Sequence, residues 1–343
     1  MEGKIKRLSA LFVGLLLIGI CFVAIRISDV RARKESEMVP GMELMDYYTT
    51  QAEEEAILLG HHMQIELPEG ITPESIIINN DSLTRLIPIT IQDLGQNYFY
   101  EHPLMGSSDH IDNLFLGNLG DNCVIEVTTN EVYEVEYSLE NKWLCLDFIP
   151  PRDLYEKVIV VDAGHGGGQP GAIKQGIQEK DLNLAILLEL KALLDTHPEW
   201  KVYYTRTDDS DVSLDQRVQL ANRAHANLFL SIHNNSTNDG RMSDYNGTEV
   251  MYDEKKPEEP LGTWHFAQIM VEETVAATGS RNLGITNGNS IYIIRTSQVP
   301  VALVEVGFMT NMEELEKLNS EEYQKTVAQG LYNGILRAWE EGF

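Results

Sequence analysis

The alternation of apolar and polar positions divides the 343-residue chain into three parts, of which the first is the most apolar. Residues 8–25 carry no charge, and a helix of that length, at about 1.5 Å per residue, nearly crosses a hydrocarbon core of about 30 Å. A cleaved signal peptide is the alternative, but the run is long for one and no A-x-A cleavage site follows it. Residues 1–40 are therefore expected to hold a short tail, one transmembrane helix and a basic flank.

The second part, residues 41–150, is expected to form a small all-β domain. Short segments rich in Ile, Val, Tyr and Phe alternate with Gly, Pro, Asn and Asp. Ile87, Ile89 and Ile91 lie on one face of such a segment. The last three segments, around residues 123–129, 132–137 and 142–148, are predicted to pair as a meander. Residues 149–153 form the linker to the third part.

The third part, residues 151–343, alternates apolar β-prone runs with segments of helical periodicity. This order predicts an α/β sandwich with a mostly parallel six-stranded sheet. Strands are expected at 158–162, 202–206, 228–233, 248–252, 291–295 and 301–306. Helices are expected at 181–194, from Ser213 with Gln216 completing a capping box, at 264–279 and at 321–340.

The charge of the chain excludes one class of partner. The formal net charge is −27, and the first 40 residues have seven basic and four acidic side chains, so the remainder is more acidic still. Such a body is repelled by phosphate backbones, and nucleic acid is set aside as a partner. The positive residues that flank 8–25 are too evenly divided to fix its orientation.

Cysteine chemistry is limited to three residues, Cys21 in the apolar run and Cys123 and Cys145 in the β-rich part. In the predicted meander these last two lie on outer strands, about 10 Å apart, which is too far for a disulfide. They are expected to be two buried free thiols.

Polar side chains end three of the predicted apolar strands. His165 follows the first, His233 ends the third, and Glu305 interrupts the last. A histidine at a strand end is usually just hydrogen-bonded, and a buried glutamate can pair with arginine. An unpaired buried carboxylate, however, costs several kcal/mol, so such a group usually serves a metal, a cation or proton transfer.

Two imidazoles and a carboxylate form a hydrolytic zinc site with one position left for water. Glu179 is a candidate third ligand, although an acid that begins a helix also suits the helix dipole. Asp162 is a competitor and is expected instead to orient His165.

These residues occur in the motifs "VVDAGHGG", "EKDLNLAI", "LFLSIHNN" and "VEVGFMTN". In this order and spacing, the second half of the chain resembles the zinc-dependent N-acetylmuramoyl-L-alanine amidases of bacterial cell walls. The resemblance implies that His165, Glu179 and His233 bind Zn²⁺ and that Glu305 is catalytic. Gln178 departs from the arginine that many relatives have before the ligand.

The resemblance also implies a substrate, the amide that joins N-acetylmuramic acid to L-alanine of the stem peptide. Arg281, Asn235 and Asn311 are candidate substrate-binding residues, with helix or turn capping as the alternative for the two asparagines. Peptidoglycan as substrate places the catalytic domain outside the cytoplasmic membrane, with one span and a cytoplasmic N-terminus. The β-rich domain is a candidate wall-targeting module whose protein partner is unknown.

Two other functions remain open at this point. The same ligand set suits a zinc peptidase that cuts the stem peptide itself. An inactive wall-binding or regulatory subunit is the other alternative, although no ligand and no catalytic residue is missing.

Overall fold

The computed structural model describes residues 60–102, 104–106, 109–256 and 261–343. The predicted fold is corrected at two points. In the described ranges no helix has the length and apolarity needed to cross a bilayer, and residues 8–25 lie outside those ranges. The α/β sheet is mixed, because one of its strand pairs is antiparallel.

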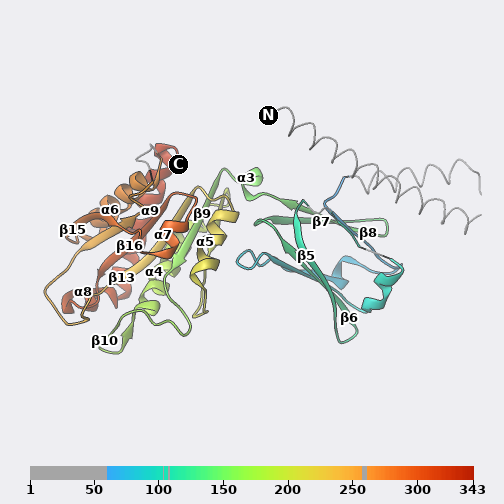
Figure 1. Cartoon of the computed structure of the whole chain (residues 1–343), viewed down its shortest axis with the longest axis horizontal. Coiled ribbons are helices and arrows are strands. Elements are labelled where there is room, and N and C mark those ends of the chain that lie inside the picture. Colours follow the sequence, from blue (N-terminus) through green and yellow to red (C-terminus); the bar gives the residue numbers. More distant parts are fainter. Residues whose placement is uncertain (1–59, 103, 107–108, 257–260) are drawn as a thin grey trace, which may run out of the picture. The chain divides into compact units, whose positions relative to one another are not determined.

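The β-rich part consists of two four-stranded sheets (Figure 1). One has the order β4-β1-β8-β7 and the other the order β2-β3-β6-β5, and all the pairs are antiparallel. Two 3₁₀ turns, Pro73–Ser75 and Gln96–Tyr100, connect strands. The strands are β1 Met63–Glu66, β2 Ile76–Ile78, β3 Leu86–Ile91, β4 Met105–Gly106, β5 Ile111–Leu119, β6 Asn122–Thr129, β7 Glu134–Glu140 and β8 Trp143–Ile149.

A single apolar core lies between these two sheets. The alternating isoleucines of β3 are buried in it, as predicted, and they belong to the same cluster as Leu144 and Leu146 of β8. The predicted meander is wrong, because β6 and β7 belong to different sheets. Cys123 and Cys145 are nevertheless buried and free, so the prediction about their thiols is confirmed.

The α/β part is built on a six-stranded sheet of order β12-β9-β13-β16-β14-β15. All its pairs are parallel except β16 with β14. The strands are β9 Lys157–Ala163, β12 Trp200–Tyr204, β13 Leu228–Asn235, β14 Thr248–Tyr252, β15 Asn282–Asn287 and β16 Val301–Phe308, and a separate hairpin joins β10 Ile173–Lys174 to β11 Ile177–Gln178.

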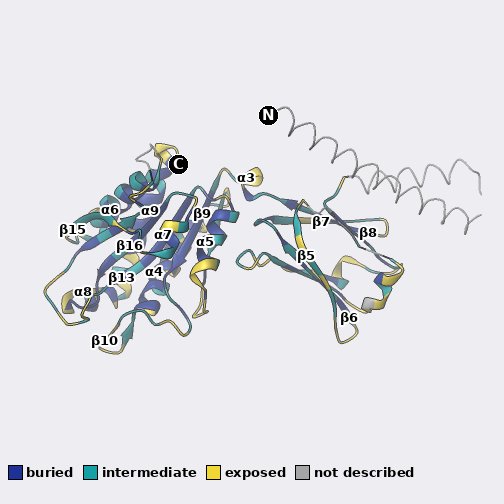
Figure 2. Ribbon diagram, in the orientation of Figure 1, coloured by how far each residue is buried: buried dark blue, intermediate teal, exposed yellow. Residues whose placement is uncertain are grey.

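Helices cover both faces of this sheet. One face packs on α4 Glu179–Leu194, α6 Thr263–Thr278 and α9 Glu321–Glu341, and the other on α5 Leu214–Arg223 and α7 Tyr292–Thr296. The part of the chain that the structure describes also has two short helices, α3 Pro151–Leu154 and α8 Met312–Leu318. An apolar core lies on each face of the sheet, and the side chains of β9 point alternately into one core and the other. The central strands have the dark blue colour of buried residues in Figure 2. The capping box of Ser213 and Gln216 is present as predicted.

The prediction of a strand at 291–295 is wrong. That segment forms α7, and the sixth strand is β15, a sequence of mixed polarity at the sheet edge. A short apolar run has no periodicity that separates a buried strand from one buried helical turn. Ile293 and Ile294 are buried in either case.

Candidate functional site

The site begins where β9 ends. His165 follows this strand with a φ of 63°, and Gly166 and Gly167 continue the turn with φ of 133° and 52°. A positive φ is uncommon outside glycine and requires support from surrounding contacts. The turn thus places the His165 imidazole at the carboxyl edge of the sheet, where α/β proteins bind ligands.

Three predicted ligand side chains meet at this edge. Glu179 is the first residue of α4, and His233 lies near the end of β13. One carboxylate oxygen, Oε1 of Glu179, lies 3.1 Å from Nε2 of His165 and 3.0 Å from Nδ1 of His233. The ligand atoms of the three residues all lie within 4.8 Å of one another.

Two glycines make this convergence possible. A Cβ on Gly164 would lie 2.2 Å from the ring of His233, and one on Gly171 would lie 2.4 Å from Oε2 of Glu179. Glycine is therefore required here so that side chains from other elements can approach the backbone closely.

The carboxylate of Glu179 is buried, yet it is strongly favoured in its ionised form. Burial alone opposes ionisation, but hydrogen bonds with His165 and His233 outweigh it and hold the pKa of Glu179 well below its usual value. Its second oxygen, Oε2, accepts a hydrogen bond of 2.9 Å from the backbone N–H of Ala172. Both oxygens of the Glu179 carboxylate therefore have hydrogen-bond partners, which fix its orientation.

Glu305 stands beside this group in a row of three polar side chains. In the strand register, Glu305 of β16 is paired with His233 of β13 on one side and with Glu249 of β14 on the other. Residues paired in register project from the same face of a sheet. Oε2 of Glu305 is shielded from solvent and has no hydrogen-bond partner in the described structure.

The pKa of Glu305 is raised well above its usual value, first by burial and then by the negative charges of Glu179 and Glu249. Sequence reasoning did not identify Glu249. Its carboxylate accepts hydrogen bonds from Nδ2 of Asn235 at 2.6 Å and from Oγ1 of Thr286 at 3.3 Å. Asn235 therefore fixes an acid that adjoins Glu305.

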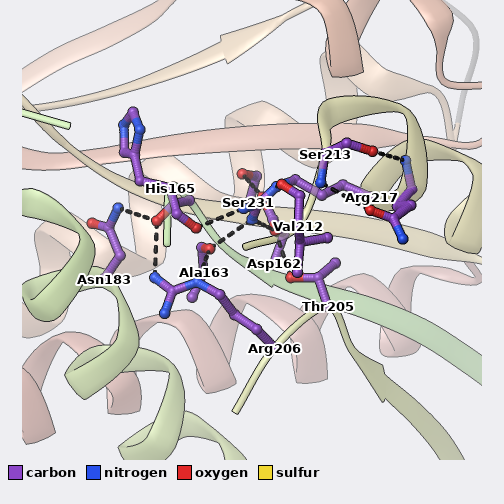
Figure 3. A network of polar contacts seen from close by, with 12 residues as sticks. Asp162, Ala163, His165, Asn183, Thr205, Arg206, Val212, Ser213, Arg217 and Ser231 are labelled. Carbon is purple, nitrogen blue, oxygen red and sulfur yellow. Dashed lines mark hydrogen bonds and ion pairs between the residues drawn. The ribbon is translucent and has the colours of Figure 1, made fainter. Parts of the chain in front are cut away.

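Asp162 acts on His165 indirectly: Arg217, which donates to the Asp162 carboxylate, also donates to the main-chain carbonyl of His165. It is fully buried, and its carboxylate accepts hydrogen bonds from Thr205 at 2.6 Å, from Ser231 at 2.7 Å and from Arg217 (Figure 3). Burial raises the pKa of Asp162, but the charge of Arg217 and the two hydroxyl groups outweigh it and lower that pKa overall.

The backbone of residues 163–165 is held by buried donors. Arg217 donates to the carbonyl oxygens of Ala163 at 2.7 Å and of His165 at 2.6 Å. Arg206 donates to those of Ala163 at 2.9 Å and Gly164 at 3.0 Å. Figure 3 shows the His165 imidazole directed away from this network, so the network supports the turn without using the ring.

The remaining candidates lie in different surroundings. Oδ1 of Asn311 accepts the backbone N–H groups of Glu313 and Glu314, so this side chain caps α8. Arg281 is exposed beside the start of β15, and Gln178 is the N-cap of α4, immediately before the ligand.

The three converging residues fit a zinc ion. They offer two imidazole nitrogens and a carboxylate oxygen, the donor set of zinc hydrolases, and one oxygen already lies within hydrogen-bond distance of both rings. The His165 side chain is 30% exposed and that of His233 17%, so an ion and a substrate can reach them.

Comparisons with known proteins identify the family of the α/β part. The family described as N-acetylmuramoyl-L-alanine amidase matches residues 159–337. The amidase CwlM of Bacillus licheniformis is 36% identical over 182 residues, which cover 53% of this chain and 68% of that protein. The uncharacterised protein YqiI of Bacillus subtilis is 35% identical, over 52% of this chain and 83% of that protein.

Among solved structures, an N-acetylmuramoyl-L-alanine amidase from Clostridium difficile 630 is similar to this chain. It superposes with a TM-score of 0.51 at 32% identity, and the match covers 55% of this chain and 98% of that chain.

Proposed function

Since the chain belongs to the N-acetylmuramoyl-L-alanine amidase family, we propose that His165, Glu179 and His233 hold the zinc ion with which it works. The protein is a peptidoglycan hydrolase that cleaves the amide between N-acetylmuramic acid and L-alanine of the stem peptide. The observation that carries the zinc proposal is the single carboxylate oxygen of Glu179 placed between two imidazoles.

Held by His165, Glu179 and His233, a zinc ion would supply Lewis acidity for a scissile carbonyl and would lower the pKa of a bound water towards about 7. The protein's own contribution is to keep the three ligands in place before an ion arrives. Gly164 and Gly171 let the side chains meet, and Arg206 and Arg217 hold the turn that carries His165.

Glu305 is proposed as the general base and then the general acid. It projects from the same face as His233 on the neighbouring strand, and one of its oxygens has no partner in the described structure. The free oxygen can take the proton of the attacking water and return it to the leaving amine of L-alanine. Groups in this role typically contribute about 10²–10⁴-fold to the rate.

The substrate also supports a proposal about location. Peptidoglycan lies outside the cytoplasmic membrane, so residues 151–343 are proposed to act on the extracytoplasmic side. The targeting role of the β-rich domain and the contribution of Arg281 to substrate binding stay predictions.

Digestion of purified peptidoglycan, followed by mass spectrometry of the products, tests the activity. Intact free stem peptides and glycan without peptide are expected. Shortened stems still joined to muramic acid would show a peptidase instead, and no release at all would favour an inactive wall-binding subunit. Removal of metal with a chelator should abolish release, and stoichiometric Zn²⁺ should restore it.

A further inference from the structure

A second set of metal-ligating side chains lies in the β-rich domain. His61, Glu140 and Cys145 each offer one ligand atom, and these atoms all lie within 4.8 Å of one another. Ligand atoms around a tetrahedral zinc ion are separated by about 3.5 Å, given bond lengths of about 2.0–2.3 Å. The three ligand atoms therefore lie close to the spacing that an ion requires.

The strand register explains why these residues meet. Cys145 of β8 is paired with Ser138 of β7, and Glu140 lies two residues further along β7, on the same face. The neighbours of Cys145 on β8, Leu144 and Leu146, point into the core between the sheets. Cys145 and Glu140 are thus on the opposite face of their sheet, where His61 reaches them from just before β1.

Both ring nitrogens of His61 face carboxylates. Nδ1 lies 2.7 Å from Oδ2 of Asp147, and Nε2 lies 3.4 Å from Oε1 of Glu140. A histidine that ligates a metal commonly donates its other ring N–H to a carboxylate, which fixes the tautomer and the ring orientation. Ser138 Oγ donates to Oε1 of Glu140 at 3.1 Å, which holds the second ligand in turn.

Among the described residues, this group is more acidic than basic. In the described part of the chain, no lysine or arginine forms an ion pair with Glu140 or Asp147. His62 does not supply the charge through Nδ1, because that atom accepts the backbone N–H of Phe148 at 2.9 Å. Two carboxylates, a neutral thiol and one imidazole are thus gathered with an excess of negative charge.

We propose that His61, Glu140 and Cys145 bind one divalent transition-metal ion of the zinc type, with Asp147 orienting His61. Thiolate and imidazole donors select zinc, cobalt or copper over magnesium and calcium. Cys145 binds through its sulfur, and the thiol proton passes to solvent. The three ligands come from the start of the domain and from both strands of the β7–β8 hairpin, so the ion would tie these segments together. This site is independent of the proposed amidase centre.

A bound ion would change the ionisation of the Cys145 thiol more than that of the other two ligands. Burial, followed by the charges of Glu140 and Asp147, raises the pKa of Cys145 to about 11. A coordinated metal ion reverses this effect, because a ligating thiol is deprotonated.

Cobalt titration of the full-length chain tests the proposal, because a Co²⁺–thiolate bond gives a near-ultraviolet charge-transfer absorption. The amidase centre has no sulfur ligand and contributes none. The wild type is expected to bind two equivalents of Co²⁺ per chain, and the one bound at Cys145 produces this absorption. It should disappear in Cys145→Ser and in His61→Ala, and persist in Cys123→Ser, which alters the other described buried thiol.

Metal content and activity separate this proposal from the amidase function. The wild type should hold two zinc ions, His61→Ala one, and His61→Ala should still release stem peptides. Circular dichroism checks that each variant is folded. No charge-transfer absorption with excess cobalt, or the same absorption in Cys145→Ser, would overturn the proposal, and in the second case the sulfur would belong to another cysteine.

Discussion

The guanidinium group of Arg217 joins the buried carboxylate of Asp162 to the main-chain carbonyl of His165. Arg217 and Asp162 are both almost completely buried, and the same guanidinium also donates to the carbonyls of Ala163 and Val212. The buried ion pair of Arg217 and Asp162 therefore holds the turn that carries His165, a proposed zinc ligand. This relationship makes zinc affinity depend on residues that do not touch the metal.

Arg217→Lys separates the charge of this pair from its geometry. Lysine keeps a positive charge near Asp162, but it cannot donate to the carbonyls of residues 163, 165 and 212 at once. Most of the stability should remain, while zinc affinity should fall by about 10–100-fold, as for other residues that support metal ligands. Competition with a chelating dye measures affinity, and urea unfolding of the metal-free protein measures stability. Unchanged affinity would mean that the turn keeps its shape without Arg217.

Asp162→Asn removes the charge that Arg217 faces. An unpaired buried arginine costs about 3–5 kcal/mol, so the variant should be much less stable at neutral pH. The pKa of Asp162 lies below its usual value of 3.8, so its stabilising effect is complete above that pH and is lost as the pH falls through the native pKa.

The stability difference between wild type and Asp162→Asn should therefore be constant from about pH 7 to about pH 5 and narrow only below about pH 4. Urea unfolding at a series of pH values measures it. The Asp162→Asn/Arg217→Ala double variant should lose far less than the sum of the two single variants, because the two residues form one unit. Additive losses would show that the pair is not coupled.

The position of the site could be predicted from the sequence because parallel strands end at one edge of a sheet. Each polar residue comes at or near the end of an apolar strand: His165 after β9, His233 in β13 and Glu305 in β16. The sheet order makes these three strands neighbours. The prediction of Glu179 as a ligand depended on the family motif, because an acid at this position also suits the N-terminus of a helix.

Glu249 was missed for a physical reason. It becomes a neighbour of Glu305 only through the antiparallel pairing of β14 with β16, and nothing local in a five-residue strand indicates its direction. The route by which Asp162 supports His165, through Arg217, was missed for a related reason. Its side chain shares the face of Val158 and Val160, towards α5, whereas His165 lies beyond the turn. Contacts that depend on register and on distant helices are absent from local patterns.

Gly164→Ala tests the close approach at the centre of the site. The new methyl group would lie 2.2 Å from the His233 ring, so the ring must move. A shift of more than about 0.5 Å spoils a ligand position, and zinc affinity should fall at least about tenfold. Gly95→Ala is the matched control, because nothing lies within 4 Å of its added carbon. Full zinc binding by Gly164→Ala, measured by metal analysis after dialysis, would contradict the observed packing.

Glu305→Gln separates catalysis from metal binding. Glutamine has nearly the same shape but cannot accept and return a proton, so turnover should fall by about 10²–10⁴-fold. Zinc content should be unchanged, because Glu305 is not one of the three converging ligands. In the metal-free state, Glu305→Gln should be at least as stable to unfolding as the wild type. The substitution replaces a buried acid that lies close to the negative charges of Glu179 and Glu249. Glu179→Gln is the contrasting variant and should lose zinc. Release of stem peptides by Glu305→Gln at the wild-type rate would assign the proton transfer to another group, with Glu249 as the nearest acid in the row.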